Sequence, residues 1–332
     1  MDLLSVVVCT YNRSTSLART LESLAAQRTN GTFTFEVIVV DNKSRDDTRA
    51  VVESFMPRFD PSTRPADSGA RSGFRPADRS AGLHMRLAYA FEGRQGLSHA
   101  RNTGVARAQG AVVAFTDDDV RPQPAWLAAL CEAFTRFRAD CVYGKVLPEW
   151  EAERPGWLSD YFLGRLALLD RGAEPFLVTD ERQEFYGANF AVTRAALAAT
   201  GAFNPALGRT GEQLGGGEDV DYFARLFRAG RRIAYAPAAV VHHRVPRERM
   251  TPGYFRRWHF QHGESSAHAE RAAGRALFGI PLWTLRDFAG HLGGWVAAGL
   301  TRRTARRLEH EMKLMFYLGL FSRTLRTTGR AS

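Results

Sequence analysis

The sequence predicts an α/β protein with a doubly wound, mostly parallel sheet flanked by helices. Two short runs rich in β-branched residues, 3–11 and 35–42, are each bounded by polar turn residues, which is typical of strands buried on both faces of a sheet. Between them lies a segment with leucines at helical spacing, and a second helical segment follows. The order β-α-β-α favours parallel strands, because each crossover helix returns the chain to the same edge of the sheet.

The two helices can be placed from their own residues. The first buries one face, formed by Leu17, Leu21 and Leu24. The second is expected to begin at a capping box made by Ser44 and Asp47. Both helices therefore carry an apolar side that can cover a sheet.

An interruption of this pattern at residues 60–82 is rich in Pro, Gly, Ser and Arg and has a single aromatic residue. That composition predicts a disordered insert. The winding resumes near residues 83–91. A helix is then expected from a cap at Ser98 to Gly110, followed by a strand at 111–115.

The composition is that of a globular protein with two differently charged parts. The 332 residues are 45% hydrophobic and 24% charged. From Arg244 onward there are 16 Lys and Arg against 6 Asp and Glu, which accounts for the whole net charge of +10. The body is therefore neutral and the last quarter basic, unlike a uniformly basic DNA-binding domain. Three cysteines without metal-ligand spacing, and an N-terminal segment without signal-peptide features, predict a cytoplasmic location.

Polar clusters follow three of the predicted strands, at residues 10–13, 41–44 and 116–119. Ligands of open parallel sheets bind beyond the carboxyl ends of the strands, so these clusters are expected to form one site. Three consecutive carboxylates in the last cluster suit Mg²⁺ or Mn²⁺, which prefer oxygen ligands and bridge to substrate phosphates. The alternative is that these aspartates only cap the next helix.

The motifs SVVVCTYNR, EVIVVDNKSRDDT, GLSHARNTGVARAQGAVVAFTDDD and GGGEDVDYFARLFRAG resemble those of the family 2 nucleotide-sugar glycosyltransferases, which have the GT-A fold. The resemblance covers residues 3–245 apart from the 60–82 insert. It implies a GT-A domain at 1–245 that transfers a sugar from a nucleoside-diphosphate donor with the help of a divalent metal.

The resemblance also implies roles for residues of the three clusters and of the helix before the third strand. It assigns to the nucleotide-sugar pocket Thr10, Tyr11, Arg13, Asp41, Arg101, Asp117 and Asp118. Asp41 would contact the base, and Arg101 would lie near the diphosphate. Asp119 would ligate the metal, whereas Asp118 has no assigned role because the family motif is Asp-x-Asp.

A second acidic motif follows three glycines at 215–217. Glu218 and Asp219 are expected on the first turn of a helix whose apolar side is formed by Val220, Phe223 and Phe227. Carboxylates at a helix start are common because the helix dipole favours them. The resemblance instead implies that Asp219 is the general base of an inverting reaction and that Glu218 orients the acceptor or tunes Asp219.

Two neighbouring histidines, His242 and His243, end a later predicted strand. The resemblance favours His243 as a further metal ligand, while His242 stays possible because adjacent strand residues face opposite sides. A purely structural histidine is the alternative. Trp150 and Trp157 lie where the acceptor should enter, and they suit either sugar stacking or the core.

The basic segment 246–332 alternates apolar and cationic patches. No apolar run reaches the roughly 20 residues that span a bilayer, so a basic amphipathic helical extension is expected, peripheral on the inner face of the cell membrane. The alternative is a helical appendage packed on the catalytic domain. No nucleic-acid-reading module surrounds the arginines, so nucleic acid is not expected as a partner.

The sequence thus predicts a metal-dependent inverting glycosyltransferase acting on a hydroxyl of a lipid-linked or polysaccharide acceptor. One alternative is a nucleotidyltransferase, which normally holds a triphosphate in a Gly-rich basic loop. The segment TYNRSTS has no glycine. Another alternative is a catalytically inactive nucleotide-sugar-binding module, which would have no need of the acidic pair Glu218 and Asp219.

Overall fold

The computed structural model describes residues 3–59, 85–211, 216–266, 276–277 and 279–328. The insert expected at 60–82 lies outside the described residues. The chain divides into two compact units. The larger contains residues 1–148, 167–211 and 218–244, and the smaller contains 149–166, 212–217 and 245–332.

The larger unit is built on a nine-stranded sheet with the order β3-β2-β1-β4-β8-β6-β9-β5, and β7 also pairs with β9. Its strands are β1 (Leu3–Thr10), β2 (Thr34–Asp41), β3 (Arg86–Phe91), β4 (Val112–Asp117), β5 (Val120–Pro122), β6 (Cys141–Trp150), β7 (Phe176–Leu177), β8 (Asn189–Thr193) and β9 (Ile233–Val245). Strands β1 to β4 are parallel, and β8 adds antiparallel to β4. The apolar runs of β1, β2 and β4 are almost fully buried, as expected for strands covered on both faces.

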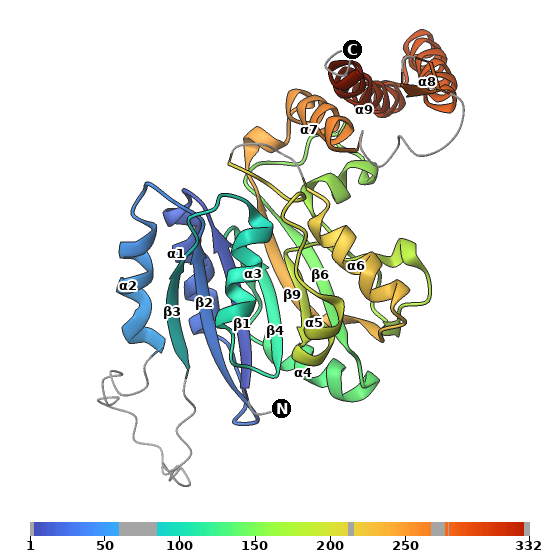
Figure 1. The fold of residues 1–332 in the computed structure, drawn as a ribbon. Helices are drawn as coiled ribbons and strands as arrows, with labels where there is room; N and C mark the ends of the chain where they lie inside the picture. The colour runs from blue at the N-terminus through green and yellow to red at the C-terminus, as the bar shows by residue number, and fades with distance from the viewer. Residues whose placement is uncertain (1–2, 60–84, 212–215, 267–275, 278, 329–332) are drawn as a thin grey trace. The chain divides into compact units, whose positions relative to one another are not determined.

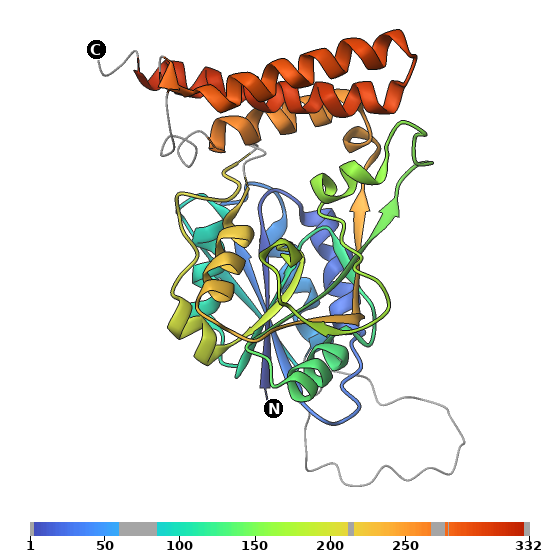
Figure 2. The same cartoon turned by 90° about the vertical axis from the view of Figure 1, so that its right-hand side faces the viewer.

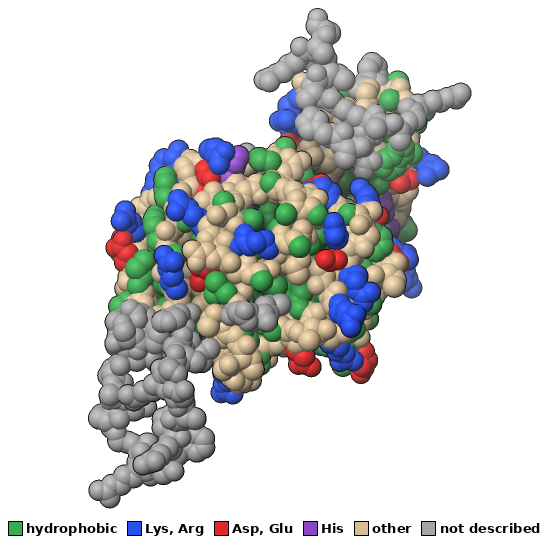
Figure 3. Space-filling view, turned by 60° about the horizontal axis from the view of Figure 1, so that its bottom comes forward, with side chains coloured by type: hydrophobic (Ala, Val, Ile, Leu, Met, Phe, Trp, Pro, Cys, Tyr) green, Lys and Arg blue, Asp and Glu red, His purple; other side chains and the backbone are tan. Residues whose placement is uncertain are grey.

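Helices cover both faces of this sheet. They are α1 (Ser14–Ala25), α2 (Thr48–Phe59), α3 (Leu97–Arg107), α4 (Trp126–Phe137), α5 (Arg194–Thr200) and α6 (Glu218–Arg228). In Figure 1, α3 and α6 lie in front of the sheet and α1 lies behind it. The predicted face of α1 is confirmed, since Leu17, Leu21 and Leu24 have no exposed surface. Figure 3 views the unit from the lower end of Figure 1, where the described Lys and Arg side chains are dispersed among other types.

Two helix starts differ from the sequence prediction. The Ser44–Asp47 capping box is not formed, because the Ser44 hydroxyl accepts from the Asn12 backbone N–H (2.9 Å). The first turn of α2 is instead capped by Asp46, which accepts from the Thr48 N–H (3.2 Å) and hydroxyl (2.5 Å). A contact between strand-end loops thus outcompetes the local cap.

Helix α3 begins one residue before the expected cap at Ser98 and ends at Arg107 rather than Gly110. Gly96 is its N-cap, with a φ of 143° that disfavours any side chain. Ser98 is buried within the helix and donates to the Leu207 carbonyl (2.8 Å). Gly110 instead runs against β1, where a Cβ would lie 2.6 Å from the Ser5 nitrogen.

The buried face of α6 differs in part from the one that the sequence predicts. Phe223 is buried, but Val220 is 37% exposed. The buried side contains Glu218 together with Tyr222 and Leu226. A carboxylate at this helix start therefore faces inward rather than toward solvent.

The described residues of the smaller unit form mainly three helices, α7 (Pro252–Ser266), α8 (Leu282–Leu300) and α9 (Thr304–Thr328). It also holds the short pair β10 (Ala276–Leu277) and β11 (Ile280–Pro281) and two 3₁₀ turns, Asp160–Leu166 and Arg247–Arg249; a third such turn, Glu181–Gln183, belongs to the larger unit. Helices α8 and α9 run side by side along their lengths (Figure 2). None of the described helices is long and apolar enough to span a membrane.

Close approach between α7 and α9 depends on two glycines. A Cβ on Gly263 would lie 2.9 Å from the Phe316 carbonyl carbon, and one on Gly319 would lie 2.8 Å from the Phe260 carbonyl carbon. Both distances are below van der Waals contact. The two helix backbones therefore touch where side chains are missing.

Candidate functional site

The three polar clusters lie at one edge of the sheet, as the sequence predicts. Thr10 at the end of β1 is in register with Asp41 at the end of β2, and Cys9 is in register with Asp117 of β4. Because these strands are parallel neighbours, their carboxyl ends present polar side chains to a common space. Thr10 and Asp41 are buried, and Tyr11 is half-buried.

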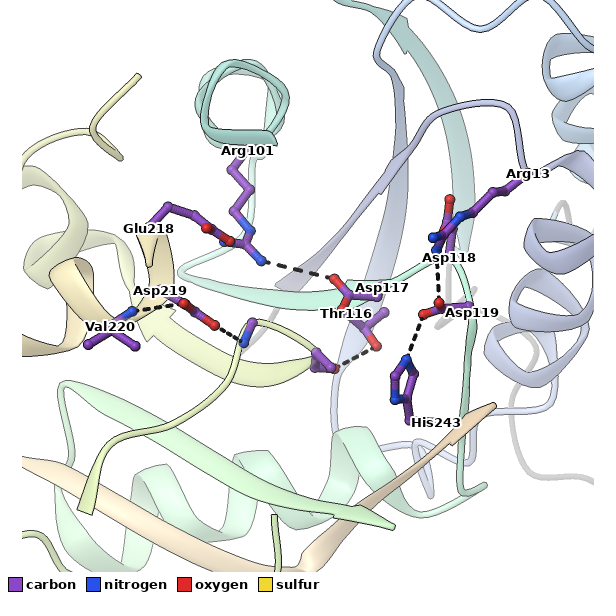
Figure 4. A network of polar contacts seen from close by, with 12 residues as sticks. Arg13, Arg101, Thr116, Asp117, Asp118, Asp119, Glu218, Asp219, Val220 and His243 are labelled. Atoms are coloured by element: carbon purple, nitrogen blue, oxygen red, sulfur yellow. Dashed lines mark hydrogen bonds and ion pairs between the residues drawn. The ribbon is translucent and has the colours of Figure 1, made fainter. Parts of the chain in front are cut away.

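Arg13 holds two of the three consecutive aspartates. Its Nη1 lies 2.8 Å from Asp119 Oδ2 and 3.0 Å from Asp118 Oδ1 (Figure 4). Burial, reinforced by the negative charge of Asp119 and opposed by Arg13, raises the pKa of Asp118 to about 6. The Arg13 side chain is 36% exposed, so the cationic group lies at the surface of the carboxylate cluster, where an anion can reach it.

His243 is the histidine that faces the aspartates. Its Nε2 lies 3.3 Å from Asp119 Oδ1 (Figure 4), because the antiparallel register pairs His243 with Val120. The ring of His242 instead contacts the Gln123 amide (3.1 Å). Tertiary structure thus distinguishes two residues that the sequence left open.

The pair Asp119 and His243 fits a divalent cation by its donor set, a carboxylate and an imidazole that meet in a buried position. Among the described residues, no three His, Cys, Asp or Glu side chains form a group able to hold a metal ion by themselves. Mg²⁺ and Mn²⁺ sites with few protein ligands take their other oxygens from water and substrate phosphates.

Asp41 is fixed by two donors at the end of β2. It accepts from the Ser44 backbone N–H (2.7 Å) and from the Tyr89 hydroxyl of β3 (2.8 Å). Burial and the hydrogen bond to Asp41 raise the pKa of Tyr89 to about 12, so this hydroxyl stays a donor. Tyr89 is not among the residues that the sequence predicts for the site, and its only sequence signal is its position near the end of a strand.

Arg101 of α3 forms a buried ion pair with the acidic motif. Its Nη1 lies 2.8 Å from Glu218 Oε1, and its Nη2 lies 4.0 Å from Asp117 Oδ1. The guanidinium also lies over the rings of Phe190 and Phe203, 5.9 and 5.5 Å from their centroids. Only 3% of Arg101 is exposed. It therefore connects the aspartate cluster of β4 to the first turn of α6.

Glu218 and Asp219 have different surroundings although they are adjacent. Glu218 is buried against Arg101, and its pKa is raised by burial and by the charge of Asp219, against the opposing effect of Arg101. Asp219 is half-buried. Its Oδ2 accepts from the Gly187 backbone N–H (2.7 Å) and its Oδ1 from the Val220 N–H (2.9 Å), as Figure 4 shows for the latter.

Gly187 lies in the segment 186–189, with the sequence YGAN, and no pattern in the sequence marks it as a site residue. It packs against the Arg101 guanidinium so closely that a Cβ would overlap Nη2, lie 3.1 Å from Cζ and lie 3.4 Å from Asp219 Oδ2. The missing side chain makes room for Arg101 while the N–H orients Asp219. One glycine thus serves both members of the acidic pair.

Comparison with known proteins identifies the family of the chain. The sequence signature described as Glycosyl transferase family 2 matches residues 5–201. The chain belongs to this family. The glycosyltransferase is 29% identical over 327 residues to the succinoglycan biosynthesis protein ExoM of Rhizobium meliloti. The alignment covers 96% of this chain and 92% of that relative. It is 26% identical over 249 residues to the glucosyl-dolichyl phosphate glucuronosyltransferase of Haloferax volcanii, covering 73% and 69% of the two chains.

Solved structures confirm the GT-A fold of the glycosyltransferase. The mannosyltransferase PcManGT of Pyrobaculum calidifontis, determined in complex with GDP-Man and Mn²⁺, superimposes with a TM-score of 0.59 at 20% identity. The match covers 96% of this chain and 86% of that one. The predicted family, fold and enzyme class are therefore all confirmed.

Ala188 and Asn189, the last two residues of the YGAN segment, connect the elements around the site of the glycosyltransferase by hydrogen bonds. The Ala188 carbonyl accepts from the Thr116 hydroxyl (3.0 Å). The buried Asn189 side chain accepts from the Trp126 indole (2.8 Å) and donates to the Lys145 and Ala239 carbonyls. This segment therefore ties β4, β6, β9 and α4 together next to Gly187, which holds Asp219.

The two tryptophans considered for sugar stacking differ in their contacts. Trp157 packs edge-to-face against Phe162 and Phe255, with ring centroids 6.0 and 5.8 Å apart, within the smaller unit. Trp150 lies under the Arg154 guanidinium (5.8 Å) and is half-buried. Trp157 therefore belongs to an aromatic core, as one of the two interpretations expected.

Proposed function

We propose that the protein is an inverting glycosyltransferase that moves a sugar from a nucleoside-diphosphate sugar to a hydroxyl, with Asp219 as general base. The observation that carries this proposal is the division between the two acidic residues. Glu218 is buried and engaged by Arg101, while Asp219 is half-buried and its carboxylate is oriented by two backbone N–H groups. A base needs a fixed orientation and access to the substrate hydroxyl.

In the proposed reaction, Asp219 accepts the proton of the acceptor hydroxyl as that oxygen attacks the anomeric carbon. The bond between this carbon and the diphosphate oxygen breaks, so the configuration inverts and the nucleoside diphosphate leaves. Each carboxylate oxygen has two lone-pair sites. The bonds from Gly187 and Val220 occupy one site on each, which leaves the other available to the proton.

Donor binding is assigned to the edge formed by β1, β2 and β4. Arg13, half exposed beside the aspartates, would counter diphosphate charge, and Asp41 would accept from the base or ribose. Asp119 and His243 would hold a divalent metal, Mn²⁺ or Mg²⁺. A bound cation would neutralise charge on the departing diphosphate. The Mn²⁺ and GDP-Man of the solved mannosyltransferase support a nucleotide-sugar donor with a metal.

Asp117 and Arg101 would complete the donor side near the diphosphate. The buried position of Arg101 adds a second role, because its pair with Glu218 links donor and acceptor sides of the site. Asp118, paired with Arg13, would keep that guanidinium in place rather than bind the metal.

The acceptor is proposed to be a lipid-linked or polysaccharide glycan. ExoM is named for succinoglycan biosynthesis, and the Haloferax relative for a glucosyl-dolichyl phosphate substrate. An enzyme whose acceptor is lipid-linked works at a membrane surface. The basic segment 246–332 would hold it there, at the inner face of the cell membrane, by attraction to anionic lipids.

The donor can be identified by a thermal-shift screen with UDP, GDP, dTDP and CDP sugars and Mn²⁺, because a ligand that binds the native state raises its apparent stability. The stabilising donor is then incubated with the purified protein. Release of the nucleoside diphosphate supports transfer or slow hydrolysis, whereas stabilisation without turnover would indicate an inactive binding module. Release of inorganic pyrophosphate from a triphosphate would indicate a nucleotidyltransferase.

A further inference from the structure

Helix α8 has two faces that differ in what they contact. The side turned toward α9 contains Thr284, Phe288, His291, Trp295 and Ala298, which repeat at intervals of three and four residues. Phe288 packs on Phe321 at 5.7 Å between ring centroids, and His291 contacts His310 at 3.1 Å between ring nitrogens. This side therefore packs within the smaller unit, with Thr284 and Ala298 buried.

The opposite side of α8 is apolar and exposed. Its large side chains at helical spacing are Leu282 (45% exposed), Leu292 (44%), Val296 (48%) and Leu300 (82%). Trp283 (36%) lies on the other border of the exposed side, about 100° round the helix from Leu282. Exposed alanines and glycines fill the spaces between them. Arg286 and Asp287, which pair with each other at 3.3 Å, are the only charged residues in the helix. A stripe of this size is uncommon on a face meant for water.

Cationic groups gather where this helix ends. The turn into α9 contains Arg302 and Arg303, and the first turns of α9 add Arg306 and Arg307, all exposed. Within the part of the chain that the structure describes, no carboxylate pairs with Arg302, Arg303 or Arg306. The nearby acids are already engaged, since Glu309 accepts from Ser159 and Glu311 pairs with Arg256.

We propose that the outward face of α8 lies in the surface of an anionic lipid bilayer, with the arginines of the α8–α9 turn on the lipid headgroups. This inference rests on the proposed membrane attachment and identifies the surface that makes it. The positive charge of the turn indicates that the partner of this face is an anionic membrane. An apolar face bordered by unpaired arginines complements acyl chains that lie beneath anionic headgroups. Helices with one apolar face bordered by cations typically lie in the plane of the membrane interface.

The arrangement explains why α8 carries its apolar residues on both sides. One side is needed to pack on α9, and the other would be a solubility liability unless it enters lipid. Arg307, stacked over Trp295 at 4.4 Å, fixes the turn that presents the cations. Trp283 is exposed in the first turn of α8, and tryptophan is favoured in membrane interfaces.

The test measures partitioning of the full chain onto vesicles of phosphatidylcholine with or without phosphatidylglycerol. Wild type should bind the anionic vesicles. The double variant Val296→Glu/Leu300→Glu, which leaves the packed side of α8 intact, should bind at least about tenfold more weakly. Phe91→Glu places the same change at a site 58% exposed in the larger unit, and it should bind as wild type does.

The cationic contribution is tested separately. Arg302→Glu/Arg303→Glu should lower partitioning by about fivefold or more for each residue, and the loss should shrink at high salt. Arg182→Glu, at an 89% exposed side chain of the larger unit, is the matched control. Quenching by brominated lipid should fall in Trp283→Phe while its partitioning stays nearly unchanged, which would show that the first turn of α8 reaches the acyl chains.

Circular dichroism and thermal unfolding of each variant exclude misfolding as the cause. The proposal is overturned if wild type ignores anionic vesicles, or if Val296→Glu/Leu300→Glu binds them normally. It is also overturned if light scattering shows a dimer that this variant dissociates, since a second copy would then cover the face. Nucleoside-diphosphate release without vesicles should be the same in wild type and variant, so a failure of the catalytic proposal is scored independently.

Discussion

The substitution Gly187→Ala tests whether the two acidic residues act through one backbone position. The new Cβ would overlap Arg101 Nη2 and lie only 3.1 Å from Cζ, where ordinary carbon contacts are about 3.5–4.0 Å. The conformation of Gly187 itself is open to alanine, because its φ is not positive. The perturbation is therefore steric and aimed at the guanidinium.

Two responses are open to the protein, and both reach the acidic pair. Arg101 can shift by roughly 1 Å, which lengthens its bond to Glu218, but Phe190 and Phe203 restrict its movement. Alternatively the backbone at Gly187 shifts, which moves the N–H that orients Asp219. Overpacking costs about 1–3 kcal/mol of unfolding free energy, and a misplacement of about 1 Å costs about 10²-fold in rate.

We expect Gly187→Ala to lower kcat by about 10²-fold, with a smaller change in the KM for the donor. Nucleoside-diphosphate release is measured under conditions where chemical denaturation shows the variant fully folded. A merely structural role would reduce the folded fraction and leave kcat per folded molecule unchanged. Gly156→Ala is the matched control, because its Cβ meets no atom within 4 Å.

A second-site change sharpens the test. Arg101→Lys places a smaller cationic group beside position 187, so the double variant should be more stable than the sum of the two single changes predicts. Wild-type kcat in Gly187→Ala would refute the link between this glycine and the acidic pair. Strictly additive stability effects would show that the two side chains do not meet.

Three further changes probe other parts of the protein. Asp219→Asn should reduce kcat by about 10²–10⁴-fold while donor affinity stays near wild type, and normal transfer would remove Asp219 as the base. Asp119→Ala should abolish the effect of Mn²⁺ on donor binding and should lower donor affinity in the presence of Mn²⁺ by at least about tenfold, as measured by calorimetry. An unchanged Mn²⁺ effect would exclude Asp119 as a ligand. Gly319→Ala, whose Cβ would lie 2.8 Å from the Phe260 carbonyl carbon, should destabilise the smaller unit by about 1–3 kcal/mol in urea unfolding. Gly290→Ala, which meets open space, should instead be neutral or stabilising, and equal stability of the two variants would contradict the close helix contact.

Local patterns predicted much of the larger unit because they depend on neighbours in the chain. Alternating apolar runs and helical spacing indicated β1, α1 and β2 to within a residue or two. The helix starts were less accurate. Ser44 looked like a cap in sequence, but the Asn12 N–H from another strand end took its hydroxyl.

The candidate site was only partly visible in the sequence. Polar clusters after strands predicted a shared edge, because parallel strands bring their carboxyl ends together. The sequence did not reveal that Arg101 pairs with Glu218, 117 residues away, or that Gly187 lies between them and Asp219. Such contacts join elements whose spacing along the chain carries no periodic signal.

The sequence by itself indicated the opening order β1-α1-β2-α2, the charge division at Arg244 and the acidic residues available for chemistry. Hydrophobic periodicity and residue type fix these features locally. Only the tertiary structure decided which histidine faces Asp119, which carboxylate is buried, and which side of α8 is left exposed. Those outcomes depend on strand register and helix packing, which are set by many distant residues at once.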